Sequence, residues 1–189
     1  MTESWRCFVA VPLDDTIRAA LSASVAAWRR EPPADGLRWA DPDSWHLTLA
    51  FLGPTRAESV PAVAQAIGDV AAAHRAFGVE TGRLGAFHRS GSARTLWYGV
   101  VDQDGALSAL AGDLYHALGL GSEEPYRPHL TLARARRRPV DLRGWIETAS
   151  LGAPSGHLDV GRVQLLRSHL GRGPARYETL ASFVLGGAP

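Results

Sequence analysis

The segment His46-Leu47-Thr48-Leu49-Ala50 decides the fold of this chain, because it recurs unchanged as His129-Leu130-Thr131-Leu132-Ala133. The two copies start 83 residues apart, which is too long for one unit of a solenoid and suits a duplicated half-domain. Each copy alternates leucines with other residues, which is the pattern of a half-buried β-strand. The sequence therefore predicts two equivalent strands in two related halves of the fold.

The residues of each copy are predicted to divide between two environments, because successive side chains of a strand point to opposite faces. The two leucines of each copy, together with Phe51 after the first copy, are expected on one face, where the leucines anchor the strand in the core. The histidine, the threonine and the alanine are expected to share the other face. If the two strands lie side by side about a pseudo-twofold axis, two imidazoles and two hydroxyls converge on one cleft.

Paired imidazoles and hydroxyls suit phosphodiester chemistry, and we predict His46 and His129 as catalytic residues. The imidazole side chain has an unperturbed pKa of about 6.5, so one ring can take a proton from water while the other gives one to the leaving oxygen. The hydroxyls of Thr48 and Thr131 can donate to non-bridging phosphate oxygens. A single His-Xaa-Thr on a strand is more often structural, and two copies favour function. A metal site is the third interpretation, although neither copy has ligands in a recognised metal spacing.

The composition excludes several kinds of chemistry. All 20 basic residues of the 189-residue chain are arginine, so a P-loop, a lysine–nucleotide adduct and a Schiff base are excluded. The single cysteine, Cys7, excludes an internal disulfide and is predicted to be a buried apolar residue. No apolar run approaches the roughly 20 residues that span a membrane, and the first residues lack a secretory signal pattern, so the expected compartment is the cytoplasm.

Predicted strands and helices mix along the chain without strict alternation, which favours an α+β fold with largely antiparallel sheets. The predicted strands cover 6–12, 46–52, 77–88, 95–101, 129–134, 157–170 and 176–185. The predicted helices cover 17–30, 57–74, 105–118 and 140–148, and Asp14 or Asp15 caps the first. A turn at 171–174 is expected to join the last two strands. We expect residues 1–189 to form a single domain with two pseudo-symmetric lobes.

At these motifs the sequence resembles the 2H phosphoesterase superfamily, which is defined by paired His-Xaa-Thr/Ser motifs. Within it, the chain looks most like the bacterial and archaeal RNA 2′,3′-cyclic phosphodiesterases, once described as 2′–5′ RNA ligases. The resemblance covers nearly the whole chain, from the opening strand through both motifs to the closing hairpin. The segments that carry it are 6–12, Arg38-Trp39, 45–53, 126–134, 166–168 and 173–177.

This resemblance implies a bilobal fold of two mostly antiparallel sheets, related by a pseudo-twofold duplication around a central cleft, with helices on the outside. It implies hydrolysis of a 2′,3′-cyclic phosphate at an RNA end to a 2′-phosphate, without metal or cofactor. His46 would be the acid toward the 3′ oxygen and His129 the base toward water, although a pseudo-symmetric pair can exchange these roles. Thr48 and Thr131 would hold the phosphate, and Arg134 matches an arginine that contacts it.

Three substrate-binding predictions depend on residues that flank the motifs. Arg134 follows His129 by an odd offset, so it reaches the cleft only if the strand twists, bulges or ends near Ala133. Phe51 and Tyr126 are predicted to stack on a base of single-stranded RNA, with core packing as the alternative.

The remaining expectations concern partners and competing functions. The arginines at 136–138 either steer RNA or form a solvated turn, and Ser168 and Tyr177 can hydrogen-bond near the cleft. The expected partners are RNA with 2′,3′-cyclic phosphate ends or small cyclic nucleotides. No membrane partner is expected, and the protein is expected to be a monomer. The alternative functions are an RNA-end or nucleotide-binding module with little turnover, and a phosphodiesterase for another cyclic phosphodiester.

Overall fold

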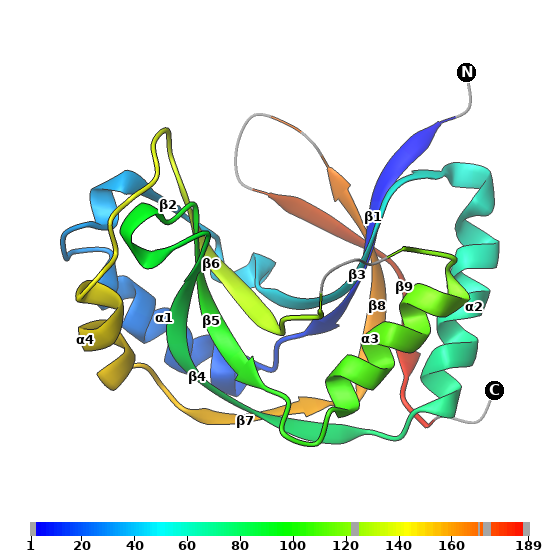
Figure 1. The fold of residues 1–189 in the computed structure, drawn as a ribbon. Coiled ribbons are helices and arrows are strands. Elements are labelled where there is room, and N and C mark those ends of the chain that lie inside the picture. Colours follow the sequence, from blue (N-terminus) through cyan, green and yellow to red (C-terminus); the bar gives the residue numbers. More distant parts are fainter. Residues whose placement is uncertain (1–2, 122–124, 170, 172–174, 187–189) are drawn as a thin grey trace.

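The computed structural model describes residues 3–121, 125–169, 171 and 175–186. Strands and α-helices mix along this part of the chain (Figure 1). The strands are β1 (Ser4–Pro12), β2 (Leu37–Trp39), β3 (His46–Arg56), β4 (Phe77–Phe87), β5 (Thr95–Val101), β6 (His129–Ala135), β7 (Gly156–Val160), β8 (Arg162–His169) and β9 (Arg176–Val184). The α-helices are α1 (Asp15–Trp28), α2 (Val60–Ala73), α3 (Ala106–Ala117) and α4 (Trp145–Leu151). None of the described helices is long and apolar enough to cross a membrane.

The strands form one curled sheet in the order β7-β4-β5-β6-β3-β1-β8-β9, and β2 pairs with β6. All of these strand pairs are antiparallel, which confirms the predicted α+β class. The repeated strands β3 and β6 are neighbours and share a single register pair, Leu47 with Leu130. The two predicted sheets are therefore two halves of one continuous sheet, because the repeated strands join them.

Both repeated strands carry a bulge at the same position of the repeat. The pairing of β3 with β1 skips Leu49, and the pairing of β6 with β5 skips Leu132. An extra residue reverses the alternation of faces beyond it. The alanine that follows each bulge is buried, and the next residue, Phe51 or Arg134, is exposed. The prediction that Phe51 shares a face with the leucines was therefore wrong, whereas the irregularity considered near Ala133 is present.

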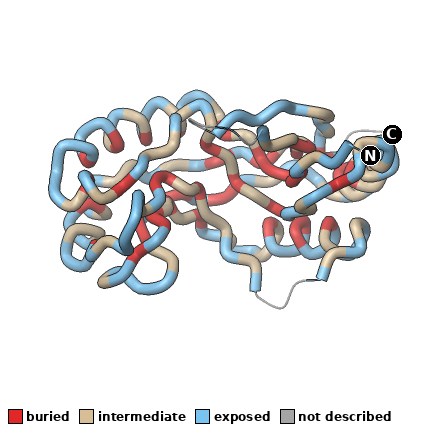
Figure 2. The backbone as a smooth tube through the Cα atoms, turned by 90° about the horizontal axis from the view of Figure 1, so that it is seen from above, coloured by how far each residue is buried: buried red, intermediate tan, exposed pale blue. Residues whose placement is uncertain are grey.

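The helices contribute apolar faces to a core that both halves of the sheet share. The carboxylate of Asp14 accepts a hydrogen bond from the backbone N–H of Ile17 at 2.8 Å, which confirms the predicted cap of α1. The buried residues of this helix recur at helical spacing; they are Ile17, Leu21, Val25 and Trp28. Figure 2 shows the buried segments in the middle of the molecule and exposed segments around its outside.

Two predicted elements near the C-terminus differ from the structure. The predicted strand at 157–170 is two strands: β7 pairs with β4 in one half and β8 with β1 in the other, so the chain crosses between halves at Gly161. The helix predicted at 140–148 begins later, at Trp145, because Val140 forms a β-bridge with Ala93. Within the expected turn, residues 172–174 lie outside the described residues, and so do the first two residues of the 173–177 segment.

Candidate active site

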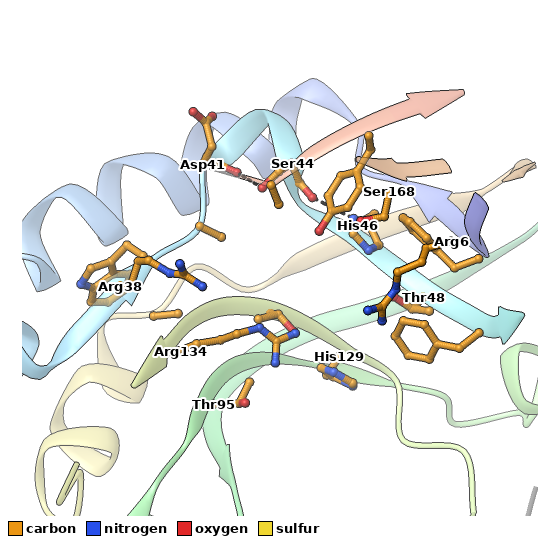
Figure 3. Close-up of a pocket in the computed structure, with 18 of the residues that line it drawn as sticks. Arg6, Arg38, Asp41, Ser44, His46, Thr48, Thr95, His129, Arg134 and Ser168 are labelled. Atoms are coloured by element: carbon orange, nitrogen blue, oxygen red, sulfur yellow. Dashed lines mark hydrogen bonds between the residues drawn. The ribbon is translucent and has the colours of Figure 1, made fainter. Parts of the chain in front are cut away.

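A cleft of about 880 Å³ lies where the repeated strands meet. His46 and Thr48 line it from β3, and His129 and Thr131 line it from β6. Figure 3 shows the two histidines on neighbouring strands across the same space. The four residues of the paired motif therefore come together, as the alternation before each bulge predicts.

The backbone holds the two imidazoles in equivalent ways. Nδ1 of His46 lies 2.7 Å from the carbonyl oxygen of Ser44, and Nδ1 of His129 lies 2.7 Å from the carbonyl oxygen of Arg127. A carbonyl oxygen can only accept, so Nδ1 is the protonated nitrogen of each ring. Nε2 of each neutral ring is consequently the atom that can take up or return a proton.

The surroundings favour the neutral form of both rings. The pKa of His46 is lowered to about 4, mainly by burial and also by the charges of His129 and Arg134, against the opposing effect of its hydrogen bond to Ser44. The pKa of His129 is lowered as well, again mainly by burial, with a contribution from Arg134. A phosphate between the rings would act in the opposite direction, because an anion stabilises the imidazolium.

Aromatic side chains pack against both imidazoles. The ring centroids of Phe8 and Tyr177 lie 4.8 and 5.0 Å from that of His46. On the other side, the Phe87 centroid lies 4.7 Å from that of His129. These contacts restrict the orientation of the imidazole planes and remove water from them, which accounts for the burial that lowers their pKa values.

The bulges bring different residues to the cleft from the two halves. Phe51 and Arg134 occupy the same position after the repeated segment, and both line the cleft. Phe51 is 65% exposed, so its side chain is not part of the hydrophobic core. The charge of Arg134 acts on both histidines. One half thus contributes an exposed aromatic ring and the other a guanidinium group.

Tyr126 lies behind the cleft. Its hydroxyl donates a hydrogen bond to the backbone carbonyl of Thr48 at 2.9 Å. Burial raises the pKa of this phenol above its ordinary value, and the ring packs against the core. Tyr126 does not occur among the described residues that line the cleft. Its contact is with the backbone that carries Thr48.

The sequence-based prediction missed several residues that line the cleft, although Ser168 and Tyr177, expected near it, do line it. Among the missed residues are Arg6, Phe8, Arg38, Phe87 and Thr95. Alternation of side chains along β1 could have placed Arg6 and Phe8 on one face, because Cys7 and Val9 belong to the main core cluster and Phe8 to a separate one. No local signal marks the others, since the pairing of β2 and of the ends of β4 and β5 brings them to the cleft.

Other reactive groups near the cleft do not form a second centre. Cys7 is 2% exposed, and burial raises the pKa of its thiol, which confirms the prediction of a buried apolar residue. Within the described ranges, no group of three or more His, Cys, Asp or Glu side chains is arranged to hold a metal ion.

A curled antiparallel sheet with two adjacent His-Xaa-Thr strands at one cleft defines the class of the 2H phosphoesterases. Residues 15–172 match the model of the 2′-5′ RNA ligase superfamily, and the chain belongs to this superfamily.

Curated relatives carry one common name. The RNA 2′,3′-cyclic phosphodiesterase of Geobacillus stearothermophilus is 34% identical over 96% of this chain, which spans 58% of that protein's length. The RNA 2′,3′-cyclic phosphodiesterase of Archaeoglobus fulgidus is 29% identical over 87% of this chain and 92% of its own length. The Escherichia coli K12 protein of the same name is 30% identical over 98% of this chain and 99% of its own length.

Solved structures share the fold. The crystal structure of TT0787 of Thermus thermophilus matches with a TM-score of 0.76 and 26% identity, over 96% of this chain and 98% of that chain. The crystal structure of E. coli LigT in apo form matches with a TM-score of 0.72 and 29% identity, over 98% of this chain and 100% of that chain.

Proposed function

We propose that this protein is an RNA 2′,3′-cyclic phosphodiesterase that opens the cyclic phosphate at an RNA end to a 2′-phosphate. One observation carries the proposal: both histidines lining the cleft are tied through Nδ1 to a backbone carbonyl, which leaves both Nε2 atoms for proton transfer. The names of the relatives support RNA with a cyclic phosphate as the substrate.

In the proposed reaction, the two histidines divide the proton transfers. Neutral His129 takes a proton from water as the water oxygen bonds to phosphorus. The bond between phosphorus and O3′ breaks, and protonated His46 gives its proton to O3′. The products are a 2′-phosphate and a 3′-hydroxyl, and solvent exchange then returns the rings to their starting states. The assignment requires the substrate anion to stabilise the imidazolium of His46, whose pKa is lowered in the free protein, so that solvent protonates the ring before it acts as the acid.

Four of the other predicted residues are assigned to substrate binding, and Tyr126 is not. The hydroxyls of Thr48 and Thr131 donate to non-bridging phosphate oxygens, and the charge of Arg134 stabilises the same group. The exposed ring of Phe51 stacks on the terminal base. Tyr126 acts through Thr48, whose backbone it holds. We also propose that the protein acts as a monomer, on RNA ends or small cyclic nucleotides, in the cytoplasm.

The test is turnover of an oligoribonucleotide with a 2′,3′-cyclic phosphate in excess EDTA, with the product phosphate located by mass spectrometry and enzymatic removal. We expect a 2′-phosphate from the wild type and a loss of roughly 10²- to 10⁴-fold or more in His46→Ala and His129→Ala. His116→Ala, on the exposed surface of α3, serves as the control that keeps activity.

Three results would contradict the proposal. An inert wild type would exclude this substrate. Activity that EDTA abolishes would exclude the metal-independent mechanism. A 3′-phosphate product would show that O2′ is the leaving oxygen, which would contradict the proposed geometry of the proton transfers.

A further inference from the structure

Two arginines face each other on the cleft side of the β2–β6 pair. Arg38 is the register partner of Arg134, both are exposed, and both line the cleft. Figure 3 shows the two side chains on neighbouring strands at the same side of the cleft. Directly opposed like charges destabilise an antiparallel strand pair. Folding alone therefore does not favour this arrangement.

The described residues leave the two positive charges without partners. Neither guanidinium forms a salt bridge with a carboxylate of the described residues, whereas Arg167, in β8, contacts Glu3 at 3.1 Å. Asp41 also borders the cleft, but its carboxylate accepts a hydrogen bond from the backbone N–H of Asp43 at 3.0 Å. The positive charge at Arg38 is consequently available to an anionic ligand.

Thr95 extends the pair into a row across three strands. It is the register partner of Arg134 on the other side of β6, in β5. Its side chain lines the cleft and is 8% exposed, and its hydroxyl makes no hydrogen bond to another described residue. The row therefore combines two guanidinium groups with a hydroxyl that can donate to a ligand oxygen.

This row is set apart from the two histidines. Arg134 follows His129 by five residues along β6, so their Cα atoms are roughly 15 Å apart at the usual rise of a strand. The charge of Arg134 lowers the pKa of both histidines, and Arg38 has no comparable effect on either. Arg134 thus reaches back toward the reacting group, and Arg38 lies further along the cleft.

We propose that Arg38 and Thr95, on the two strands that flank Arg134, bind the next phosphate of the RNA strand, on the 5′ side of the terminal nucleotide, while Arg134 serves the reacting phosphate. This inference rests on the proposed function, because the cyclic phosphate at the histidines defines which phosphate is next. The planar guanidinium of Arg38 can donate two hydrogen bonds to one phosphate. The row makes an oligonucleotide end a better substrate than a mononucleoside cyclic phosphate.

The experiment compares two dinucleotides that end in the same 2′,3′-cyclic phosphate. One has the natural phosphodiester linkage, and the other has an uncharged methylphosphonate linkage. We expect the wild type to prefer the charged linkage in kcat/KM by roughly tenfold or more, since hydrogen bonds to a charged group contribute about 1.5–3 kcal/mol. In Arg38→Gln the preference falls close to one, and this ratio is the readout.

The matched control is Arg94→Gln, which removes the same charge next to Thr95 at an exposed position of the described chain outside the cleft lining. The control keeps the preference of the wild type. Equal turnover of the two linkages by the wild type would overturn the inference. A loss in Arg38→Gln by the same factor on both linkages would also overturn it, because Arg38 would then serve the reacting phosphate.

A binding measurement separates this inference from the proposed function. If neither dinucleotide is opened, the proposed function fails, and adenosine 3′,5′-bisphosphate and adenosine 3′-monophosphate still test the row by calorimetry. We expect the bisphosphate to bind the wild type more tightly, by roughly tenfold or more, and Arg38→Gln to lose this difference. Equal affinities in the wild type would exclude a second phosphate site at Arg38.

Discussion

His46 and His129 have equivalent backbone partners but different electrostatic surroundings. Each donates from Nδ1 to the carbonyl oxygen two residues earlier in the chain. The lowered pKa of His46 follows from its deeper burial and from two nearby positive groups. The carbonyl groups of Ser44 and Arg127 therefore hold the two rings in the same way although these two residues differ, and the surrounding side chains decide how readily each ring is protonated.

Binding of a phosphate that raises these lowered pKa values is coupled to uptake of a proton by the protein. We expect adenosine 2′-monophosphate to bind with proton uptake near neutral pH, because His46, with a pKa of about 4, is neutral in the free protein. The affinity for adenosine 2′-monophosphate should therefore fall as the pH rises through the raised pKa of His46 in the complex. Calorimetry in two buffers of different ionisation enthalpy measures the uptake. His46→Gln should reduce the uptake, and His116→Gln should not. Binding without proton uptake would contradict the expectation.

At the scale of elements, the segment before β6 is tied to β3 by one hydrogen bond. Tyr126 precedes β6 and donates to the carbonyl oxygen of Thr48 on β3. β3 is thereby held by the segment before β6 as well as by its own neighbouring strands. The contact positions the Thr48 backbone without touching the cleft.

Removal of the Tyr126 hydroxyl should weaken this link. We expect Tyr126→Phe to lower the free energy of unfolding by about 1–2 kcal/mol, since the half-buried carbonyl loses its donor, and to reduce kcat/KM for the cyclic phosphate severalfold. Urea unfolding and steady-state kinetics measure the two effects. Tyr115→Phe, in α3, is the matched control, because its hydroxyl makes no hydrogen bond to a described side chain or backbone group. Equal effects of the two variants would contradict this role.

The sequence predicted the elements better than their irregularities. The α+β class, the cap at Asp14 and the meeting of His46 with His129 follow from local patterns. The bulges at Leu49 and Leu132 do not, because a bulged strand and a regular one have the same apolar alternation in sequence. The crossing at Gly161 was missed for a similar reason, since a single residue separates two strands that belong to different halves. The position of Arg38 at the cleft, opposite Arg134, depends on the register of β2 against β6, which cannot be read from a short segment of sequence.

At the scale of the molecule, the two halves share a core. Leu47 and Leu130 are fully buried, pair with each other across the junction, and belong to the cluster that includes residues of all four α-helices. We propose on this basis that residues 1–189 form a single domain with two pseudo-symmetric lobes.

A shared core should produce a single unfolding transition. We expect the calorimetric and van't Hoff enthalpies of unfolding to agree, and the midpoints by tryptophan fluorescence and circular dichroism to coincide. Leu130→Ala, which leaves a cavity at the junction, should lower both midpoints together, at a cost of about 2–5 kcal/mol. Two separate transitions, or a variant that shifts only one probe, would indicate halves that unfold independently.

The bulge within each repeated segment also gives the cleft a direction. Two identical strands about a twofold axis would accept a nucleic acid strand equally well in either polarity. The identity of the two copies ends at the first residue beyond the repeat, which is Phe51 in one copy and Arg134 in the other. The bulges turn both side chains toward the cleft. A ring that suits a base and a cation that suits a backbone thus stand at opposite ends of a symmetric frame. Under the proposed function, the cleft therefore favours one polarity of the bound strand.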